Sequence, residues 1–281
     1  MKKVVLTGST GLIGKEAKRP LQMAGFEVID LTRKDCDLLN HNQVENFFKH
    51  HKPQYLLHFA WITGNGCLSA SVNNDLCDAS FFMLKAFCAN GGKRAVFSGT
   101  CFEYDFSDEP LKENAPIKPR SLYAQKKHEL NMICSSFAEK NNISYAWGRI
   151  FYVYGHDEKQ ERLTAYIINR LLQNEIAVVN FGQLKRDYMY TEDIAAAFVK
   201  LLDSDIVGNV NVCTGEGITL ESYAKMIAKK LHKENLLKIH HALTDQPLNI
   251  IGDNTILTKR VGFIPKYDYS TALNNILSRL L

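Results

Sequence analysis

Short apolar runs alternate with helix-length segments through the first half of the chain. β-Branched and aromatic residues, which favour strands, are frequent in these runs. Regular alternation of such strands with helices predicts an α/β fold, with a parallel sheet covered by helices on both faces. The predicted strands are residues 3–7, 26–31, 55–59, 94–98 and 143–148.

The regular alternation breaks after Gly148. A helix is expected near residues 161–174, an apolar run follows at 176–182, and another helix is expected at 191–203. We interpret the later segments as a smaller lobe set over the carboxyl edge of the sheet. The predicted sheet domain comprises residues 1–151 and about 188–213, and the predicted lobe comprises about 152–187 and 214–281.

The length and composition of the chain place it among globular proteins. It has 281 residues, of which 46% are hydrophobic, and this is enough for a sizeable core. The apolar run after Lys2 and Lys3 stops at Thr7, too early for a signal peptide or a membrane span. We therefore expect a cytoplasmic protein that has no membrane partner.

Charge and cysteine content narrow the class of ligand. The net charge of +4 comes from scattered Lys and Arg residues, not from a basic stripe with interleaved aromatics, so nucleic acid is not an expected partner. A mild positive balance suits an anionic small molecule. The seven cysteines form no C-x-x-C pair and no cluster with histidine, so we expect reduced thiols and no metal site.

Three glycines follow the first predicted strand in the stretch VVLTGSTGLIGKEA, at Gly8, Gly11 and Gly14. Glycine suits this place because the turn must be tight, backbone N–H groups must approach a diphosphate, and the helix must pack on its strand. The N-terminus of that helix also favours an anion. The order of strand, turn and helix therefore predicts a dinucleotide site.

The tip of the second predicted strand bears on which dinucleotide binds. A carboxylate at this tip would hydrogen-bond the adenosine ribose of NAD, but the tip aligns with Thr32, and Arg33 follows it. A guanidinium pairs well with the 2′-phosphate of NADP(H), which an Asp would repel. We therefore expect NADP(H) to be preferred. Asp30 leaves NAD(H) possible, and Arg33 as a solvated surface residue is the alternative interpretation.

Tyr123 and Lys127 stand four residues apart on a predicted helix, whose same face continues through Leu130, Cys134 and Phe137. One helical turn therefore brings a phenol and an ammonium side by side. An adjacent ammonium stabilises a phenolate, which suits a tyrosine to acid–base work near neutral pH. Such a pair is common by chance, but together with the glycine turn it becomes specific.

These motifs together resemble the extended short-chain dehydrogenase/reductase family, in the branch that acts on nucleotide sugars. The resemblance covers nearly the whole chain. It implies a Rossmann fold, that is, a doubly wound parallel sheet, with a smaller C-terminal lobe that binds the substrate. The matching pieces are Thr7-Gly8-x-x-Gly11-x-x-Gly14, Thr100 at a strand end, Tyr123-x-x-x-Lys127, and residues 149–155, 186–198 and 259–268.

The resemblance also implies roles for single residues. Thr100 takes the place of the catalytic Ser/Thr, whose hydroxyl hydrogen-bonds the sugar oxygen that gains or loses charge. Tyr123 is the general acid or base, and Lys127 holds the nicotinamide ribose while it lowers the pKa of the tyrosine. The implied cofactor contacts are Gly8, Thr10, Gly11, Leu12, Ile13, Thr32, Arg33, Ala60, Tyr123 and Lys127.

On the substrate side, the resemblance implies that Arg186 contacts a diphosphate, for which its planar fork is suited. A second arginine that the family commonly carries is absent, and Arg162, Lys185 or His241 would either replace it or be solvated surface residues. Trp61 is expected to lie partly in the core and to border the nicotinamide or the sugar. The expected substrate contacts are Trp61, Glu103, Arg162 and Arg186.

Departures from the family pattern bear on the reaction. Sugar 4,6-dehydratases of the family follow the catalytic Thr with Asp-Glu, whereas Cys101 and Phe102 stand here and cannot act as that pair. The epimerase-reductases of GDP-fucose synthesis carry a Cys two residues beyond the hydroxyl, but Cys101 is one beyond and would point the other way. His156 lies near the acidic His of those enzymes, and a solvated loop histidine is the favoured interpretation.

The resemblance therefore implies an NADP(H)-dependent reductase of a nucleotide-diphosphate-linked 4-keto-6-deoxy sugar, acting in deoxysugar or polysaccharide biosynthesis as a homodimer. A nucleotide-sugar 4-epimerase with tightly bound NAD is the first alternative. A non-catalytic NADP-sensing protein is the second, and the intact set of Thr100, Tyr123 and Lys127 argues against it. The nucleotide base, the sugar and the product stereochemistry stay open, because they depend on loops whose geometry the sequence does not define.

Overall fold

A six-stranded parallel sheet forms the centre of the molecule. The computed structural model describes residues 2–280, and the strands of this sheet run in the order β10-β5-β4-β3-β1-β2. Neighbouring strands all pair in parallel. The order reverses between β1 and β3, which confirms the expected doubly wound Rossmann-type sheet. The strands are β1 (Lys2–Thr7), β2 (Phe26–Leu31), β3 (Tyr55–His58), β4 (Arg94–Thr100), β5 (Ser144–Ile150) and β10 (Gly208–Val212).

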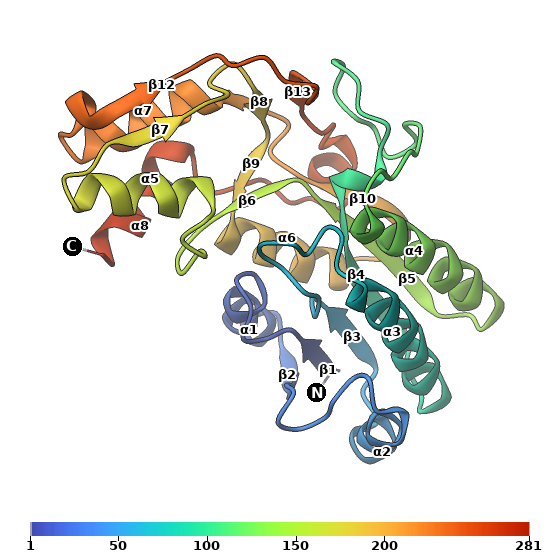
Figure 1. Cartoon of the computed structure of the whole chain (residues 1–281). Helices are drawn as coiled ribbons and strands as arrows, with labels where there is room; N and C mark the ends of the chain where they lie inside the picture. The colour runs from blue at the N-terminus through green and yellow to red at the C-terminus, as the bar shows by residue number, and fades with distance from the viewer. Residues whose placement is uncertain (1, 281) are drawn as a thin grey trace.

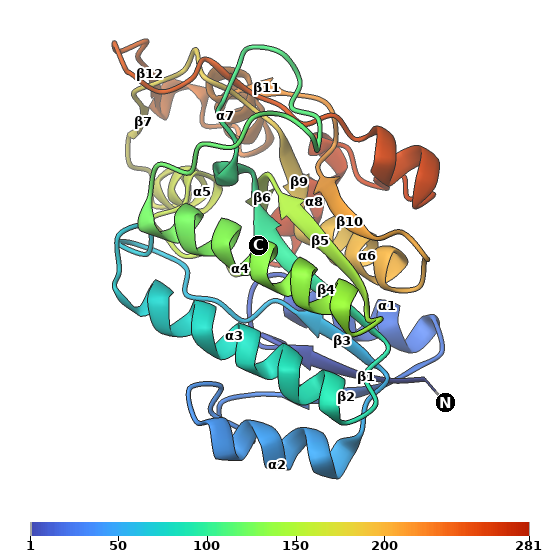
Figure 2. The same cartoon turned by 90° about the vertical axis from the view of Figure 1, so that its right-hand side faces the viewer.

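Two groups of helices cover the two faces of the sheet (Figure 1, Figure 2). Successive side chains of a strand point to opposite faces, so Val4 and Leu6 pack in one cluster with α1 and α6. Val5, which lies between them, packs in the other cluster with α2, α3 and α4. All three are fully buried, and for this reason the strands read as continuous apolar runs. The helices are α1 (Gly14–Met23), α2 (His41–His51), α3 (Val72–Ala89), α4 (Leu122–Lys140) and α6 (Thr191–Leu202).

Parallel pairing brings the carboxyl ends of the strands to one edge of the sheet. Thr7 of β1 pairs with Leu31 of β2 and with His58 of β3, and Thr100 of β4 pairs with Ile150 of β5. Residues that directly follow these strands are therefore neighbours in space although they lie far apart in sequence. Doubly wound sheets bind ligands at this edge, beside the point where the strand order reverses.

The sixth strand, β10, is absent from the sequence-based assignment. All five strands expected from the apolar runs are present, but β10 reads Gly-Asn-Val-Asn-Val and has no such run. Its Asn211 is fully buried, because the side-chain oxygen accepts from the Tyr104 hydroxyl (2.7 Å) and the amide nitrogen donates to the Leu111 carbonyl (2.7 Å). A buried edge strand can thus carry polar residues where long-range partners satisfy them.

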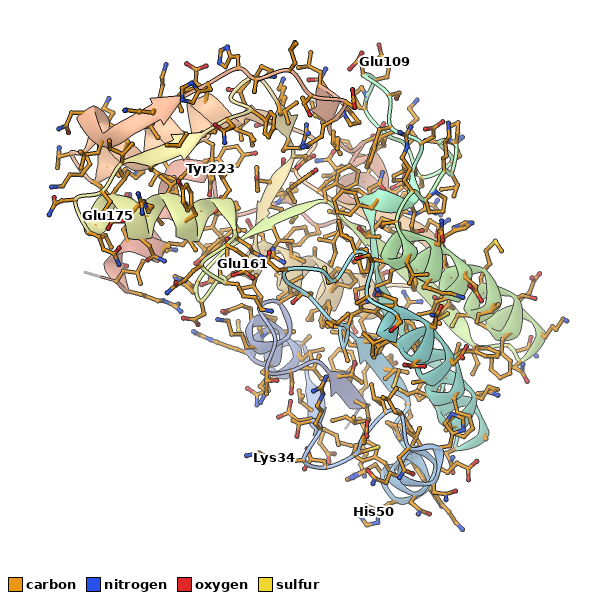
Figure 3. All side chains as sticks on the ribbon, in the orientation of Figure 1. Lys34, His50, Glu109, Glu161, Glu175 and Tyr223 are labelled. Atoms are coloured by element: carbon orange, nitrogen blue, oxygen red, sulfur yellow. The ribbon has the colours of Figure 1, made fainter. Side chains whose placement is uncertain are left out.

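The remaining elements form a lobe at the end of the molecule opposite α2 (Figure 1). Tyrosines fill much of its core; the rings of Tyr188 and Tyr223 are stacked 5.2 Å apart, and Figure 3 shows Tyr223 inside the lobe. The lobe elements are β6 (Tyr152–Tyr154), α5 (Leu163–Leu172), β7 (Ala177–Val179), β8 (Lys185–Arg186), β9 (Tyr188–Tyr190), β11 (Ile218–Thr219), α7 (Leu220–Lys230), η2 (Glu234–Leu236), β12 (Leu237–Ile239), β13 (Asn249–Ile250) and α8 (Tyr269–Ser278).

One segment of the predicted lobe packs on the sheet instead. The short helix η3 (Ile256–Arg260) follows the lobe strand β13, yet Leu257 and Val261 are buried in the same cluster as Val4 and Leu6. These two apolar side chains lie four residues apart and so share one face of the turn, which contacts β10. The division of the chain into a sheet domain and a lobe stays a prediction, and at this segment the chain packs against the sheet.

Candidate active site

The glycine turn joins β1 to α1 and has no room for side chains. Gly8 has a φ of +67°, a left-handed conformation that favours glycine, and a Cβ there would lie 2.7 Å from the Ala60 nitrogen. A Cβ on Gly14 would collide with the Gly8 carbonyl. The Gly11 N–H donates to that carbonyl (2.9 Å) and closes the turn. The residues that directly follow β3 therefore pack against the glycine turn, at the point where the strand order reverses.

The residues of this turn fit a dinucleotide diphosphate. Ser9 is buried, and its Oγ has no hydrogen-bond partner among residues 2–280. A buried hydroxyl without a partner, next to the start of a helix, is suited to an anionic oxygen. Thr10 and Gly11 are exposed, whereas Leu12 and Ile13 are half-buried. An anion can therefore approach the exposed backbone at Thr10 and Gly11, next to the half-buried apolar side chains of Leu12 and Ile13.

A buried hydrogen-bond chain, not anticipated from the sequence, supports the switch point. The Thr7 hydroxyl lies 2.7 Å from His58 Nδ1, and His58 Nε2 lies 3.0 Å from the Ser80 hydroxyl. Thr7 Oγ1 also accepts from the Ala60 N–H (3.2 Å). Burial, and then the charge of Lys127, lowers the pKa of His58, so its ring is neutral. A histidine inside an apolar strand was the available signal, and its role is to connect β1, β3 and α3.

The tip of β2 presents an exposed arginine. Thr32 directly follows the strand, and its hydroxyl donates to Asp35 (2.6 Å), while Arg33 is exposed. Lys34 points away from the molecule (Figure 3). Asp30 pairs with Lys18 of α1 at 2.6 Å. One oxygen of this carboxylate is therefore engaged by a lysine while Oδ1 has no partner among residues 2–280, and the Arg33 side chain is exposed.

Thr100 ends β4 and also presents its hydroxyl. The chain turns there into the short helix η1 (Cys101–Glu103), and Thr100 Oγ1 accepts from the Phe102 N–H (3.3 Å). Glu103 Oε1 accepts from the Thr100 N–H (3.0 Å), which completes a reciprocal capping box. A hydroxyl that accepts through a lone pair still has its own proton to donate. Thr100 can therefore cap the turn and donate to a ligand at the same time.

Tyr123 lies in the first turn of α4, directly opposite Thr100. The helix begins behind Ser121, whose hydroxyl accepts from the Ala124 N–H (3.2 Å). Burial raises the pKa of Tyr123 above its ordinary value, and the Thr100 side chain, which faces the phenol, partly offsets this rise. The phenol is therefore protonated at neutral pH, and it can act as a proton donor.

Lys127 lies one turn further along α4 and is 1% exposed. Its Nζ donates to the Ser98 carbonyl (2.8 Å) and lies 3.9 Å from the centroid of the Trp61 ring. Burial lowers the pKa of Lys127 to about 7, while the charge of Glu103 opposes this shift. The amino group is therefore held between a backbone carbonyl and an aromatic face, next to the end of β4.

Trp61 is half-buried, as expected of a partly core residue. Its Nε1 donates to Asn73 Oδ1 (2.8 Å), and Asn73 itself is fully buried. The indole ring meets the Tyr123 ring edge to face, with centroids 6.4 Å apart. Its contact with a sugar or a nicotinamide stays a prediction, but its place beside Tyr123 and Lys127 is consistent with one.

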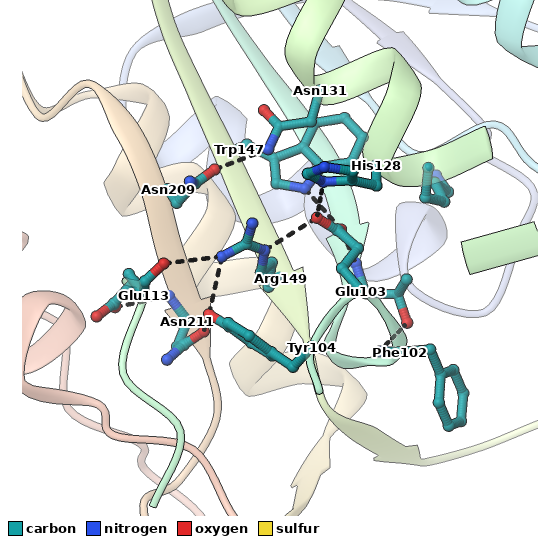
Figure 4. A network of polar contacts seen from close by, with 12 residues as sticks. Phe102, Glu103, Tyr104, Glu113, His128, Asn131, Trp147, Arg149, Asn209 and Asn211 are labelled. Carbon is teal, nitrogen blue, oxygen red and sulfur yellow. Dashed lines mark hydrogen bonds and ion pairs between the residues drawn. The ribbon is translucent and has the colours of Figure 1, made fainter. Parts of the chain in front are cut away.

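Glu103 is a correction to the expected substrate contacts. It is fully buried, and its two carboxylate oxygens accept from Thr100, Trp147 and Arg149 (Figure 4). The η1 turn directs this side chain inward to cap the end of β4. A substrate therefore cannot reach the carboxylate.

The two lobe arginines expected to contact a diphosphate differ in how accessible they are. Arg186 is 2% exposed; its Nη1 donates to the carbonyls of Lys185, Pro247 and Leu248. Arg162 is the half-buried N-cap residue of α5. Substrate contacts by Arg186 and Arg162 stay predictions. His241 lies at the surface, where it contacts Glu221 (2.7 Å).

His156 is buried and not solvated, which corrects the sequence-based expectation. It is 4% exposed, and its Nε2 lies 2.5 Å from the Tyr190 hydroxyl. Burial lowers the pKa of His156, so its ring is neutral. The Lys15 amino group donates to the His156 carbonyl (3.3 Å), and Lys159 donates to the Thr63 carbonyl (2.7 Å). The loop around His156 thus connects α1 with the segment that follows β3.

Three further findings concern the described part of the chain. No helix within residues 2–280 is long and apolar enough to cross a bilayer. Over the same range, no group of three or more His, Cys, Asp or Glu side chains is arranged to hold a metal ion. The seven cysteines are all unpaired, and five of them are buried.

The site geometry agrees with a family-level match. The model of the NAD dependent epimerase/dehydratase family matches residues 4–213, which include the glycine turn, Thr100, Tyr123 and Lys127. The chain belongs to this family. The match spans all six strands of the central sheet, so the family accounts for the whole carboxyl edge described above.

Within this family, several relatives carry names of nucleotide-sugar synthases. GDP-L-colitose synthase of Yersinia pseudotuberculosis is 24% identical over 97% of this chain and 96% of the relative. CDP-abequose synthase of Salmonella muenchen is 26% identical over 57% of this chain and 56% of its own length. GDP-L-fucose synthase 1 of Arabidopsis thaliana is 23% identical over 97% of this chain and 91% of its own.

Solved structures of the same fold cover the chain almost completely. UDP-glucose 4-epimerase of Thermotoga maritima, solved with UDP-glucose, matches with a TM-score of 0.88 at 21% identity over 99% of this chain and all of that chain. UDP-glucose 4-epimerase of Thermus thermophilus, solved with NAD, gives a TM-score of 0.85 at 22% identity over 98% of each chain. At these identities the likeness shows the fold.

Proposed function

We propose that this protein reduces a nucleotide-diphosphate-linked 4-keto-6-deoxy sugar with NADPH. The observation that carries the proposal is the placement of Tyr123 and Lys127 on α4 beside the end of β4, where Thr100 lies, at the edge that also holds the glycine turn. A ketone that accepts hydride needs a proton donor at its oxygen, and the Tyr123 and Thr100 hydroxyls supply a donor and a second hydrogen bond. Relatives named as synthases of GDP-L-colitose and CDP-abequose support a nucleotide sugar as substrate.

The roles of the side chains in this reaction follow from their placement. The nicotinamide, when bound, supplies the hydride. Tyr123 gives its proton to the carbonyl oxygen as negative charge develops there. Thr100 donates a hydrogen bond to the same oxygen and so stabilises that charge before the proton arrives. Lys127, whose amino group lies at the end of β4 one helical turn from Tyr123, binds the nicotinamide ribose.

NADPH is proposed over NADH on the basis of the β2 tip. The exposed Arg33 is positioned to pair with a 2′-phosphate, and a bidentate guanidinium contact of this kind is strong. Lys18 pairs with Asp30 Oδ2, whereas Asp30 Oδ1 is buried and has no hydrogen-bond partner among residues 2–280, so this carboxylate keeps NADH possible. NADH remains a usable cofactor with lower affinity.

The lobe is proposed to bind the nucleotide diphosphate. Arg186 and Arg162 supply positive charge there, and Trp61 borders the sugar or the nicotinamide from the sheet side. The division into a dinucleotide domain and a substrate lobe, the homodimer and the place in deoxysugar biosynthesis belong to the same proposal. The mild positive net charge of the chain suits such an anionic substrate.

A substrate panel tests the proposal. The purified protein is incubated with NADPH and with dTDP-, GDP-, CDP- and UDP-linked 4-keto-6-deoxyhexoses, and the absorbance of the reduced nicotinamide is followed. We expect oxidation of NADPH with at least one nucleotide. Interconversion of a nucleotide-linked 4-hydroxy sugar, supplied in a parallel sample without NADPH, would favour the 4-epimerase. NADPH binding without turnover of any sugar would favour the non-catalytic alternative.

A further inference from the structure

A buried carboxylate stands directly behind Thr100, and the proposed reaction does not use it. Glu103 Oε1 accepts from the Thr100 N–H (3.0 Å) and from Trp147 Nε1 (2.8 Å), and its Oε2 accepts from Arg149 Nε (3.0 Å). An ionised carboxylate accepts only, so three converging donors match its lone pairs. Figure 4 shows Trp147 and Arg149 converging on Glu103.

The residue before Thr100 makes room for this arrangement. A Cβ on Gly99 would collide with the Trp147 indole and would lie 2.8 Å from Glu103 Oε1. Gly99 also pairs in register with Arg149 on β5. The end of β4 is therefore shaped around the carboxylate, and any side chain at position 99 would displace it.

The network connects β4 and α4, which carry the proposed catalytic residues, with the neighbouring strand β5. Arg149 Nη1 donates to the Tyr104 hydroxyl (3.0 Å) and to the Glu113 carbonyl (3.0 Å), which anchors the guanidinium on its far side. His128 follows Lys127 on α4, and its Nδ1 lies 3.8 Å from Glu103 Oε2. Glu103 thus lies at the junction of β4, β5 and the helix that carries Tyr123 (Figure 4).

The charge of Glu103 acts on the same group of residues. Burial alone would raise the pKa of Glu103, but the His128 ring and the Arg149 charge lower it below its ordinary value, so the carboxylate is ionised at neutral pH. This charge raises the pKa of Tyr123 and that of Lys127. Both groups are thereby favoured in their protonated forms, which a proton donor and its neighbour require in a reduction.

We propose that Glu103 is a positioning residue, which fixes the Thr100 peptide so that the Thr100 hydroxyl points at the atom that Tyr123 protonates. The proposal rests on the proposed function. Thr100 is extended, with φ −147° and ψ 146°, and its Oγ1 already accepts from the Phe102 N–H. With the backbone held from behind by Glu103 and the lone pair engaged in front, the O–H donates toward Tyr123 and the substrate.

A double-mutant cycle tests whether Glu103 acts through Thr100. Glu103→Gln keeps the size of the side chain, but one carboxylate oxygen becomes an NH₂ group that faces an N–H donor. We expect Glu103→Gln to lower kcat about tenfold with an unchanged KM for NADPH, since a misdirected hydrogen bond acts mainly in the transition state. In the Thr100→Val background, the same change is expected to lower kcat by no more than about twofold, because the hydroxyl it orients is gone.

Glu113→Gln is the matched control. Glu113 Oε1 accepts from the Asn211 N–H (2.9 Å) and belongs to the same network, but it does not touch Thr100. We expect its kcat to match that of the wild type. An equal loss of kcat for Glu103→Gln in both backgrounds, or no loss in either, would overturn the proposal. If Glu103→Gln does not bind NADPH, Glu103→Asp, which keeps the charge and retracts it by one methylene, is put through the same cycle.

Amide hydrogen exchange separates this proposal from the proposed function. The cycle is measured on the nucleotide sugar that the wild type converts: a 4-keto-6-deoxyhexose if it reduces, or a 4-hydroxy sugar if it epimerises. Independently of turnover, the peptide that contains Thr100 should exchange about tenfold faster in Glu103→Gln than in the wild type or in Glu113→Gln. Unchanged exchange there would contradict the positioning role even if the wild type is an active reductase, and faster exchange would support it even if no sugar is reduced.

Discussion

The two ends of the candidate site differ in how firmly they are held. At the reaction end, Thr100 and Lys127 are buried and each is tied to the backbone or to a buried side chain. At the adenosine end, Arg33 is exposed and Thr32 contacts only its own loop, through Asp35. Both ends lie on the same edge of one sheet.

This difference indicates which step needs side chains in exact positions and which needs only charge. Proton donation is efficient only if the donor lies close to its correct position. The reaction end is therefore fixed by hydrogen bonds before any ligand binds. Recognition of a 2′-phosphate depends mainly on charge, and a long exposed guanidinium can adjust to it. Substitutions at the reaction end should therefore affect rates, and those at the adenosine end should affect affinity.

The largest effect is expected for Tyr123→Phe. The change removes one hydroxyl and with it the proton donor, so single-turnover hydride transfer should fall by about 100- to 10,000-fold. NADPH affinity and melting temperature should stay near those of the wild type. Tyr145→Phe, which removes a buried hydroxyl from β5 at a residue that carries no role in the reaction, serves as the control and should leave the rate unchanged. A normal rate in Tyr123→Phe would contradict the mechanism.

Arg33→Ala sharpens the contrast at the adenosine end. Loss of a charged hydrogen bond should weaken NADPH binding by about 1.5–3 kcal/mol, while the affinity for NADH barely changes. Titration of both cofactors measures this, and Lys34→Ala at the neighbouring exposed position is the control. Equal losses for NADPH and NADH would remove Arg33 as the residue that discriminates between them.

Lys127 makes stability depend on pH. Its pKa falls from the ordinary 10.5 to about 7 in the folded chain, so between these values the unfolded chain binds more protons than the native one. The free energy of unfolding should therefore rise with pH, by about 2 kcal/mol more in the wild type than in Lys127→Met between about pH 7 and 9. Urea unfolding at both pH values measures it. Lys126→Met, on the exposed side of α4, should retain the wild-type slope; parallel slopes for Lys127→Met and the wild type would contradict the burial argument.

Thr100→Val is expected to give the smallest effect. The β-branched shape is kept while one oriented hydrogen bond is lost, so turnover should fall about tenfold at normal stability. The kcat of the purified variant, with its melting temperature, measures this. If turnover stays unchanged, Thr100 only ends the strand, and the reaction end needs no second hydroxyl.

The reaction end was largely predictable from the sequence. Gly8, Gly11 and Gly14 follow a strand, Tyr123 and Lys127 share a helical face, and a parallel sheet brings strand ends such as Thr100 to one edge. These are local patterns whose spacing carries their meaning. In a parallel sheet the carboxyl ends of the strands meet at one edge, so these residues can be placed together without knowledge of any long-range contact.

The errors occurred where a partner lies far along the chain. Glu103 is buried because Arg149 donates to it from 46 residues away, and His156 is buried against Tyr190, 34 residues away. The strand β10 carries Asn211, whose partner Tyr104 lies 107 residues earlier. A polar residue in isolation reads as exposed, because no local pattern shows that a distant donor or acceptor will satisfy it.

The most direct test of the account is the stoichiometry of the wild-type reaction. The protein is mixed with NADPH and the nucleotide-linked 4-keto-6-deoxyhexose that it converts in the substrate panel, and the NADPH oxidised and the sugar product formed are measured in the same sample. The account predicts one NADPH consumed for each 4-hydroxy sugar formed. Formation of a sugar product with no net oxidation of added NADPH would contradict it.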